Sequence, residues 1–287
     1  MPSVICRAAP LVYNTIHIAP PSIIVKMNQL VKIIIPVYKT DLNRTDIISL
    51  NQAVKVLNHY PKVIIKPNSL DVTEVLDLYP DTFEIESFDD HYFANIAGYN
   101  RLMLSAEFYE RFLHVKYILI YQLDAFVFRD ELTQWCQRGY DYIGAPWLCK
   151  LKYRRFPLNF FLKLRGAVYS LTGIKHRQQC FFKVGNGGFS LRKVDTCYRK
   201  TIEMQSRIHT YLSRVGESSQ FNEDVFWALE ATKNNDFSIP TWQEAIHFSF
   251  DLFPKICFQF AQKQLPFGCH RWNKELNFWK DYINLPD

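Results

Sequence analysis

Four short motifs of this sequence carry residue types that could do chemistry, and the first lies at the end of an apolar run. In "YILIYQLDAFVFRD", Gln122 and Asp124 stand at the end of the apolar run. Their side chains point to the same face of the predicted strand, because side chains alternate along a strand. A carboxylate in that place can hold a divalent cation that neutralises a diphosphate. It can equally cap a turn or helix at 129–135. The motif alone leaves both interpretations open.

The second motif, "VGNGGFSLR", gathers three of the ten glycines of the chain around Asn186. Glycine lets a ligand approach the backbone closely, and it also permits a tight turn or bulge before a strand. Because the chain is poor in glycine, the clustering of Gly185, Gly187 and Gly188 favours a required backbone position. The spacing is not the phosphate-binding GxGxxG fingerprint, which opens a helix after a strand.

The third and fourth motifs supply further ionisable groups. In "FNEDVFWALE", Glu223 and Asp224 fall in the first turn of a predicted helix, where acids are ordinary. One of them could instead be a general base for an attacking hydroxyl. In "PFGCHRW", His270 is either a structural histidine or, if the chain returns to Asp124, a ligand suited to Mn²⁺. Three aromatic residues could stack on a base or a sugar, or belong to the core: Tyr38, Trp147 and Trp272.

The elements that would position these motifs alternate between buried strands and amphipathic helices. Apolar runs at 31–37, 62–66 and 117–123 predict strands, and helical patterns separate them. This alternation predicts an α/β, Rossmann-like fold with a mostly parallel central sheet flanked by helices, in a single domain. Ligands of such sheets bind beyond the carboxyl ends of the strands. The ends to inspect are 36–41, 124 and 144–147. The other predicted elements are strands at 83–86 and 184–191 and helices at 44–58, 70–78, 94–113, 194–208 and 223–230.

Length and composition exclude several classes of protein. A chain of 287 residues with 48% hydrophobic and 22% charged residues is neither disordered nor fibrous, and it can bury a large core. Its seven cysteines form no CxxC pair, which favours a reducing compartment and a cytoplasmic location. No uninterrupted apolar run is long enough to span a bilayer. Residues 1–26 are interpreted as a dispensable extension, which leaves a domain at 27–287.

The net charge of +6 is concentrated in one segment. Between Lys150 and Lys183 there are nine Lys and Arg and no Asp or Glu, interleaved with aromatic and aliphatic residues. Such a segment could lie on anionic lipid headgroups, as a peripheral membrane contact, or grip a diphosphate-bearing substrate. Nucleic acid is not expected as a partner, because no known binding motif accompanies the charge.

Taken in order, the motifs resemble the successive stations of a GT-A glycosyltransferase. They are "IIIPVY" on the first strand, "DAF" at 124–126, "YDYIGAPW", "GNGGFSLR" at 185–192, "NEDVFW" at 222–227 and "PFGCHRW". Together they resemble a poorly characterised family of glycosyltransferase-like proteins, carried as a domain of unknown function. The resemblance covers roughly 31–272.

The resemblance implies a nucleotide-sugar donor and a divalent metal, Mn²⁺ or Mg²⁺. It places Pro36, Val37 and Tyr38 beside the nucleotide base. Asp124 and His270 would hold the metal that bridges the donor diphosphate, with Gln122 beside them. The family motif is Asp-x-Asp, and aligning it on either Gln122 or Asp124 leaves one carboxylate absent.

The resemblance also implies roles on the acceptor side. The acidic motif would supply the base of an inverting transfer, which is Asp224, with Glu223 as the alternate. Arg101, in "GYNRLML", would assist the leaving group. The acceptor would be a glycan or a lipid-linked glycan. The wall that faces the acceptor would comprise Trp147, Asn186, Gly187 and Gly188.

Two other classes of protein remain open at this stage. A nucleotidyltransferase shares the nucleotide-binding sheet and the metal, but "PVYKTDLNR" lacks the glycine that its first loop usually has. A non-catalytic binding protein on a GT-A scaffold would explain the absent carboxylate. The presence of Asp224 and of the glycine motif opposes that interpretation.

Overall fold

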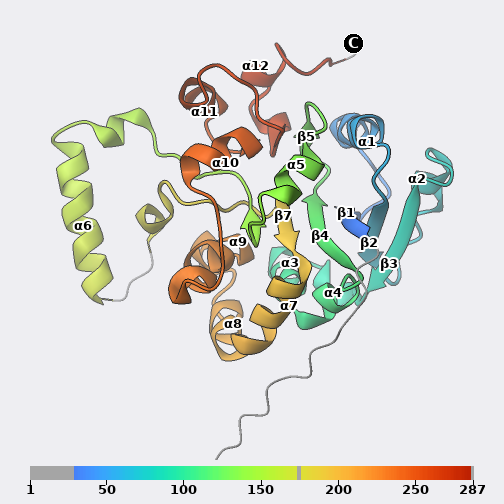
Figure 1. The fold of residues 1–287 in the computed structure, drawn as a ribbon, viewed down its shortest axis with the longest axis horizontal. Helices are drawn as coiled ribbons and strands as arrows, with labels where there is room; N and C mark the ends of the chain where they lie inside the picture. The colour runs from blue at the N-terminus through green and yellow to red at the C-terminus, as the bar shows by residue number, and fades with distance from the viewer. Residues whose placement is uncertain (1–28, 173–175, 286–287) are drawn as a thin grey trace, which may run out of the picture.

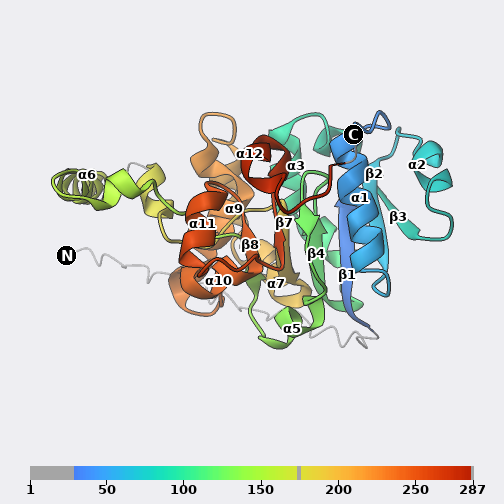
Figure 2. The ribbon, with the colours of Figure 1, turned by 90° about the horizontal axis from the view of Figure 1, so that it is seen from above.

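A six-stranded sheet forms the centre of the molecule in the computed structural model, which describes residues 29–172 and 176–285 (Figures 1 and 2). The strand order is β3-β2-β1-β4-β7-β6. The four strands β1 to β4 run parallel, whereas β7 is antiparallel to both β4 and β6. The predicted α/β fold with a mostly parallel sheet is therefore confirmed. The strands are β1 Gln29–Pro36, β2 Lys62–Pro67, β3 Phe83–Phe88, β4 Val115–Tyr121, β6 Tyr142–Ile143 and β7 Phe189–Lys193.

Helices cover both faces of this sheet, which explains why its central strands are continuously apolar. Ile33 and Ile35 of β1 pack on one face with Leu50 of α1, and Ile34 packs on the other with Phe108 of α4. A capping box formed by Asn43 fixes the start of α1. The first face is covered by α1 (Arg44–Val56), α2 (Thr73–Asp77) and α5 (Leu132–Gln137). The second face is covered by α3 (Ile96–Met103), α4 (Ala106–Glu110), α7 (Val194–Glu203) and α8 (Gln205–Leu212).

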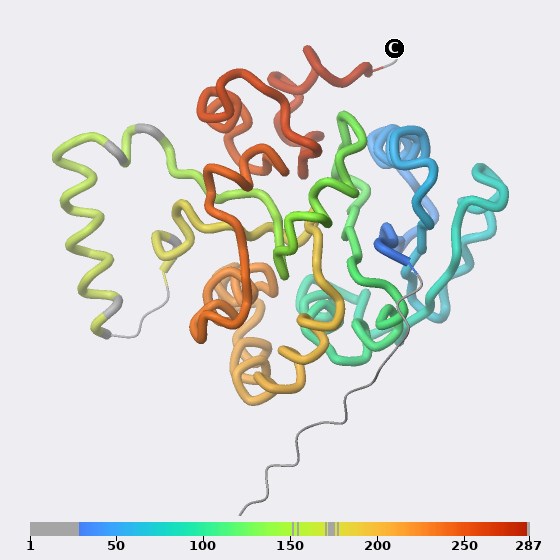
Figure 3. Tube along the Cα trace, in the orientation of Figure 1, coloured from blue at the N-terminus to red at the C-terminus, as the bar shows by residue number. Residues whose placement is uncertain are grey.

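The C-terminal part of the chain returns to the end of β4. In Figure 3 the trace beyond residue 240 lies beside the loop that follows β4. Strand β9 (Gly268–Cys269) pairs with both β5 (Phe126–Val127) and β8 (Ser249–Phe250), with Phe126 opposite Cys269. The pairing of these three strands brings the chain around 124, before β5, and the chain after 250, beyond β8, close to His270. Around it pack α10 (Trp242–Phe248), α11 (Pro254–Phe260) and α12 (Leu276–Trp279).

Several predicted elements have different boundaries in the structure. The helix expected at 94–113 is two helices. The first ends at Met103, and the Ser105 hydroxyl accepts a hydrogen bond from Phe108 N as the N-cap of the second. The helix expected at 194–208 ends at Glu203, and α8 begins at Gln205. The strand expected at 184–191 starts only at Phe189, because the glycine motif precedes it as a loop.

The helix expected at 223–230 starts as α9 (Glu223–Val225) and continues as a single π-helical turn, Phe226–Glu230. Single-turn π-bulges of this kind occur frequently at functional sites. The remaining short helical turns are η1 Asp90–Tyr92, η2 Leu151–Arg154, η3 Arg177–Cys180, η4 Ser219–Phe221, η6 Ala231–Asn234 and η7 Trp272–Lys274.

The basic segment 150–183 contains a helix, α6 (Leu158–Thr172), that projects from the body of the molecule (Figures 1 and 2). No helix within 29–172 and 176–285 is long and apolar enough to cross a membrane. The expected extension at 1–26 lies outside the described residues.

Candidate active site

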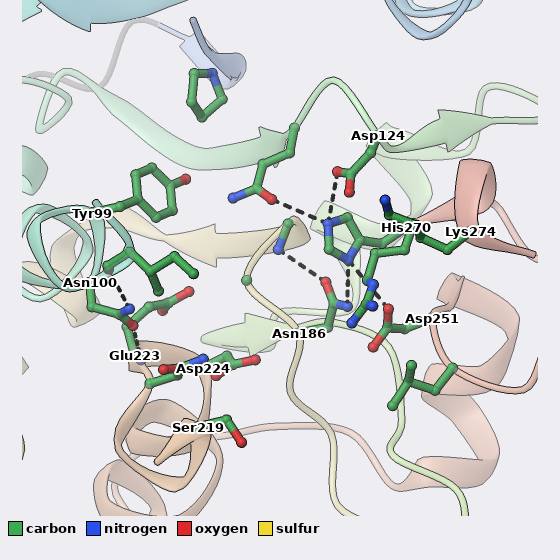
Figure 4. A pocket seen from close by; sticks show the side chains of 18 of the residues that line it. Tyr99, Asn100, Asp124, Asn186, Ser219, Glu223, Asp224, Asp251, His270 and Lys274 are labelled. Atoms are coloured by element: carbon green, nitrogen blue, oxygen red, sulfur yellow. Dashed lines mark hydrogen bonds and ion pairs between the residues drawn. The ribbon is translucent and has the colours of Figure 1, made fainter. Parts of the chain in front are cut away.

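A cavity of about 1030 Å³ opens at the carboxyl ends of β1 and β4, where ligands of parallel sheets bind (Figure 4). Its walls come from the loops after β1 and β4, the glycine motif, the start of α9 and the turn after β9. Two clusters of ionisable side chains face it, one around His270 and one around Glu223 and Asp224. The two clusters come from segments far apart in the sequence.

The first cluster is built on the imidazole of His270. Its Nε2 lies 3.0 Å from Oδ1 of Asp124 and 3.2 Å from Oε1 of Gln122. Its Nδ1 lies 2.9 Å from Nδ2 of Asn186 and 3.4 Å from Oδ1 of Asp251, the residue that follows β8. The ring is therefore held between two carboxylates.

The two carboxylates and the histidine shift one another's protonation. Burial favours the neutral imidazole, but the hydrogen bonds and charges of Asp124 and Asp251 outweigh it and raise the pKa of His270 to about 9. Burial also raises the pKa of Asp124, yet the hydrogen bond and charge of His270 hold that pKa below its ordinary value. Asp124 is thus an ionised carboxylate at neutral pH.

Asn186 fixes the position of the ring from the side of the glycine motif. Its Oδ1 accepts hydrogen bonds from the backbone N–H groups of Gly188 (3.0 Å) and Phe189 (3.2 Å), so its Nδ2 faces the imidazole. The residue has a φ of 68°, in the left-handed region that Asn tolerates better than most residues. Asn186 is only 4% exposed, and its side chain supports the imidazole of His270 from within the wall of the cavity.

The second cluster contains a buried ion pair. Glu223 Oε1 lies 3.1 Å from an Nη of Arg192, and both side chains are buried. Arg192 also donates to the hydroxyls of Tyr109 and Ser190. Burial raises the pKa of Glu223, and the charge of Arg192 and its hydrogen bond oppose that rise. The backbone N–H of Glu223 is held in turn by Oδ1 of Asn100 on α3.

Asp224 lies next to this pair, and within 29–172 and 176–285 no arginine forms an ion pair with it. Its carboxyl is partly exposed and lines the cavity. Loss of water around the group, together with the charge of Glu223, raises the pKa of Asp224 to about 7. A carboxyl with such a pKa can accept a proton near neutral pH, as a general base must.

The glycine motif separates the two clusters, and each glycine allows one close approach. A Cβ on Gly187 would lie 1.8 Å from Oε1 of Glu223, and a Cβ on Gly188 would lie 2.1 Å from Nε2 of His270. The carbonyl of Gly188 also accepts a hydrogen bond from Gln122 N at 2.9 Å, which ties the motif to the end of β4. The glycines are therefore needed because side chains occupy the space of a Cβ.

Most of the residues singled out in the sequence meet at this cavity, but Val37, Arg101 and Trp272 do not line it. Val37 is buried in the core on the α1 face of the sheet, because it continues the apolar alternation of β1, so the expectation that it lies beside the base is wrong. Arg101 is exposed on α3 and is not among the residues that line the cavity, so its expected role at the leaving group is not supported. Trp272, considered for stacking, is fully buried, and its indole N–H donates to Ser49. The residues that do line the cavity are Pro36, Tyr38, Gln122, Asp124, Trp147, Asn186, Gly187, Gly188, Glu223, Asp224 and His270.

Asp251 and the cationic residues of the cavity were not predicted from the sequence. Asp251 directly follows a short apolar run, the same signal that drew attention to Asp124, but "FSF" was too short to be identified as a strand. The cationic residues follow β1 and β9 in the chain. They are Lys39, Arg271 and Lys274.

A carboxylate, an imidazole and an amide oxygen meet around Asp124, and donors of these kinds can bind divalent metal ions. Two ligands in neighbouring positions of an octahedral ion, each about 2.1 Å from it, lie roughly 3.0 Å apart. His270 Nε2 and Asp124 Oδ1 lie 3.0 Å apart, a separation that suits both their ion pair and two ligands of one cation. No group of three or more His, Cys, Asp or Glu that could hold a metal occurs in residues 29–172 and 176–285, so other ligands would have to come from amides, water or substrate.

The fold is similar to that of solved glycosyltransferases. The chain resembles the bifunctional glycosyltransferase WbbM with a TM-score of 0.50 and 10% identity, over 85% of this chain and 46% of that one. It also resembles the galactosyltransferase LgtC, solved with donor and acceptor sugar analogues (TM-score 0.48, 11% identity, 89% of this chain and 98% of that one). The mannosyltransferase Ktr4p from S. cerevisiae in complex with GDP has a TM-score of 0.40 and 11% identity, over 63% of each chain. The similarity to WbbM, together with the strand order, shows a GT-A-like fold.

The family of the chain follows from its sequence. Residues 82–270, about two thirds of the chain, match the family described as protein of unknown function DUF5672, and the chain belongs to that family. No curated protein matches the chain in sequence. The match includes the glycine motif, both acidic residues of α9 and His270.

Proposed function

We propose that this protein transfers a sugar from a nucleotide-sugar donor to a hydroxyl of a glycan or lipid-linked glycan, with inversion at the anomeric carbon. One observation carries the proposal: a single cavity holds an ionised carboxylate beside a histidine on one side and a carboxyl with a pKa of about 7 on the other. Sugar transfer needs both, an anchor for a charged leaving group and a base for the attacking hydroxyl.

The donor would lie across the carboxyl ends of β1 and β4. Tyr38, 62% exposed at the edge of the cavity, offers a ring face to the nucleotide base. Lys39, Arg271 and Lys274 line the same cavity and supply positive charge to the diphosphate. Asp124 and His270 would hold a Mn²⁺ or Mg²⁺ ion, which neutralises charge on the leaving diphosphate when it is bound.

Asp224 would take the proton from the acceptor hydroxyl as the oxygen attacks the anomeric carbon and the bond to the diphosphate breaks. The environment of Asp224 favours it over Glu223 as the general base, because the carboxylate of Glu223 is buried and paired with Arg192. Both residues line the cavity, but the Glu223 side chain is almost fully buried against Arg192, whereas Asp224 is partly exposed to the cavity. Transfer should accelerate as the pH rises through about 7, since the base must be deprotonated.

A variant of the base tests the proposal directly. Asp224→Asn should lower turnover by roughly 10² to 10⁴, the usual contribution of a general base, while donor affinity remains. Asp281→Asn, an equally conservative change at an exposed position outside the cavity, should leave turnover unchanged. Near-normal turnover in Asp224→Asn would remove that residue from the role. Loss of turnover in Glu223→Gln at retained folding would then assign the role to Glu223.

Donor and metal are tested by thermal unfolding of the purified chain with UDP-, GDP-, CMP- and dTDP-sugars, with and without Mn²⁺. A ligand at about 100 times its Kd stabilises by roughly 2.7 kcal/mol. A rise in melting temperature that requires Mn²⁺ and disappears in Asp124→Asn would support Asp124 and His270 as metal ligands. A rise that occurs without metal would contradict that role. No shift with any donor, in a protein that unfolds cooperatively, would favour a non-catalytic scaffold. NMR of the product would report the anomeric configuration.

A further inference from the structure

The outward face of α6 carries large apolar side chains that are at least half exposed to solvent. These side chains are between 50% exposed (Val168) and 89% exposed (Leu171). Spacings of three and four residues place them on one side of the helix. The members of this outward face are Phe160, Phe161, Leu164, Val168 and Leu171.

The opposite side of α6 packs on residues 176–178, near the end of the same segment. Leu162 and Tyr169 are partly buried there, and the Tyr169 ring contacts the ring of His176 at a centroid distance of 5.1 Å. The side-chain amide of Gln178 donates to the carbonyl of Leu162 and accepts from Arg165 Nε, both at 3.3 Å. The apolar side of α6 therefore faces away from these contacts, and the helix itself lies apart from the body of the molecule (Figure 2).

Positive charge borders the outward face. Helical geometry places Lys163 at one edge of the apolar arc and Arg165 at the other, and both are exposed. The whole segment 150–183 has nine Lys and Arg and no acid. None of its described basic residues lines the cavity, so the alternative that this segment grips the donor diphosphate is not supported.

We propose that the outward face of α6 docks on the surface of a lipid bilayer with anionic headgroups. Apolar side chains at the centre of the face would enter the headgroup boundary, and the flanking cations would meet the negative surface. The helix has only 15 residues, and Asn159, Lys163 and Arg165 interrupt its apolar sequence, so it would lie in the plane of the surface rather than span the bilayer. A second copy is a poorer partner, because it would bring two basic segments with no acids together.

The docked helix would also keep the cavity close to the bilayer. Leu148, just before the segment, and Phe181, within its last turn, both line the cavity. A lipid-linked acceptor would therefore be presented to the cavity from the side on which α6 lies. This consequence rests on the proposed function, whereas the docking itself does not.

Flotation of the purified full chain with vesicles tests the docking. The chain should float with vesicles of phosphatidylcholine and phosphatidylserine, float weakly with phosphatidylcholine alone, and dissociate as salt is raised. Lys163→Gln with Arg165→Gln should weaken binding to the anionic vesicles roughly thirtyfold, at about 1 kcal/mol for each cation. Phe161→Gln with Leu164→Gln should weaken binding to both kinds of vesicle at least about tenfold.

A matched control is available on the body of the protein. Ile202 on α7 is 45% exposed and lies outside the segment, so Ile202→Gln should bind vesicles as the wild-type chain does. Failure of the folded wild-type chain to float, or equal binding by Phe161→Gln with Leu164→Gln, would overturn the proposal. So would a solution dimer that the same double variant dissociates, since the face would then belong to a second copy. These readouts need no sugar transfer, so they fail or succeed independently of the proposed function.

Discussion

The two charged clusters that face the cavity balance their carboxylates in different ways. Around His270, two carboxylates share one titratable ring. In the other cluster the buried guanidinium of Arg192 pairs with Glu223. Among the described residues no cation pairs with the neighbouring Asp224. The glycine motif keeps the clusters apart and touches both.

This difference determines which carboxyl can hold a proton near neutral pH. The histidine keeps the pKa of Asp124 low, so Asp124 stays charged and suits a cation. Asp224 has a pKa of about 7 because burial and the charge of Glu223 act in the same direction. One cavity thus offers a permanent anion and a proton acceptor, which is the division of roles that acid–base chemistry requires.

The largest effect is expected from breaking the pair between Arg192 and Glu223. Arg192→Met should lower the free energy of unfolding by about 3–5 kcal/mol, because it leaves Glu223 buried without its partner. The loss should be smaller at pH 5 than at pH 8, since a proton can then neutralise Glu223. Chemical denaturation would measure it. Arg214→Met, which removes an exposed pair with Glu217, should change stability by less than about 1 kcal/mol; an equal loss in both variants would contradict the importance of burial.

An added methyl group in the glycine motif separates the two clusters experimentally. Gly187→Ala should push against Glu223, and Gly188→Ala against His270, each with a loss of about 1–3 kcal/mol of unfolding free energy. Gly166→Ala on α6 meets only a ring carbon of His176 at 3.8 Å and should be neutral or slightly stabilising. Gly188→Ala should in addition abolish any metal-dependent thermal shift, which Gly187→Ala should leave in place. Identical behaviour of the two would mean that the clusters do not act separately.

The smallest expected effect concerns the free energy of unfolding, which the raised pKa of Asp224 lowers. The folded protein keeps a proton on Asp224 that the unfolded chain releases near its ordinary pKa of 3.8, so this group lowers stability progressively as the pH rises from about 4 to about 7. Asp224→Asn removes that dependence and should gain about 1–2 kcal/mol at pH 8 and nearly nothing at pH 4, after allowance for partial exposure. Thermal unfolding across this pH range measures the gain. A constant difference between the two proteins would refute the shifted pKa.

Much of the frame of the site could be predicted from local patterns. The apolar runs identified β1, β2 and β4, and the rule that ligands bind beyond parallel strands placed Asp124 at the cavity. The pattern failed where two neighbouring residues point in opposite directions. Val37 and Tyr38 were expected to act together, but strand alternation sends Val37 into the core and Tyr38 to the cavity.

Asp251 shows what local patterns could not supply. It reaches His270 only because β8 and β9 pair over two residues each, and two-residue strands leave no periodic signal in the sequence. Arg192 is hidden for a related reason. In the sequence it is one cation in a strand pattern, and its commitment to Glu223 depends on a contact 31 residues away along the chain.

The sequence by itself determined the α/β alternation, the glycine motif and the identity of the acids, because these depend on side-chain type and short spacing. Only the tertiary structure decided which acid keeps a proton. Protonation depends on burial and on the charges within a few ångströms, and those neighbours come from α3, β7, β8 and the turn after β9.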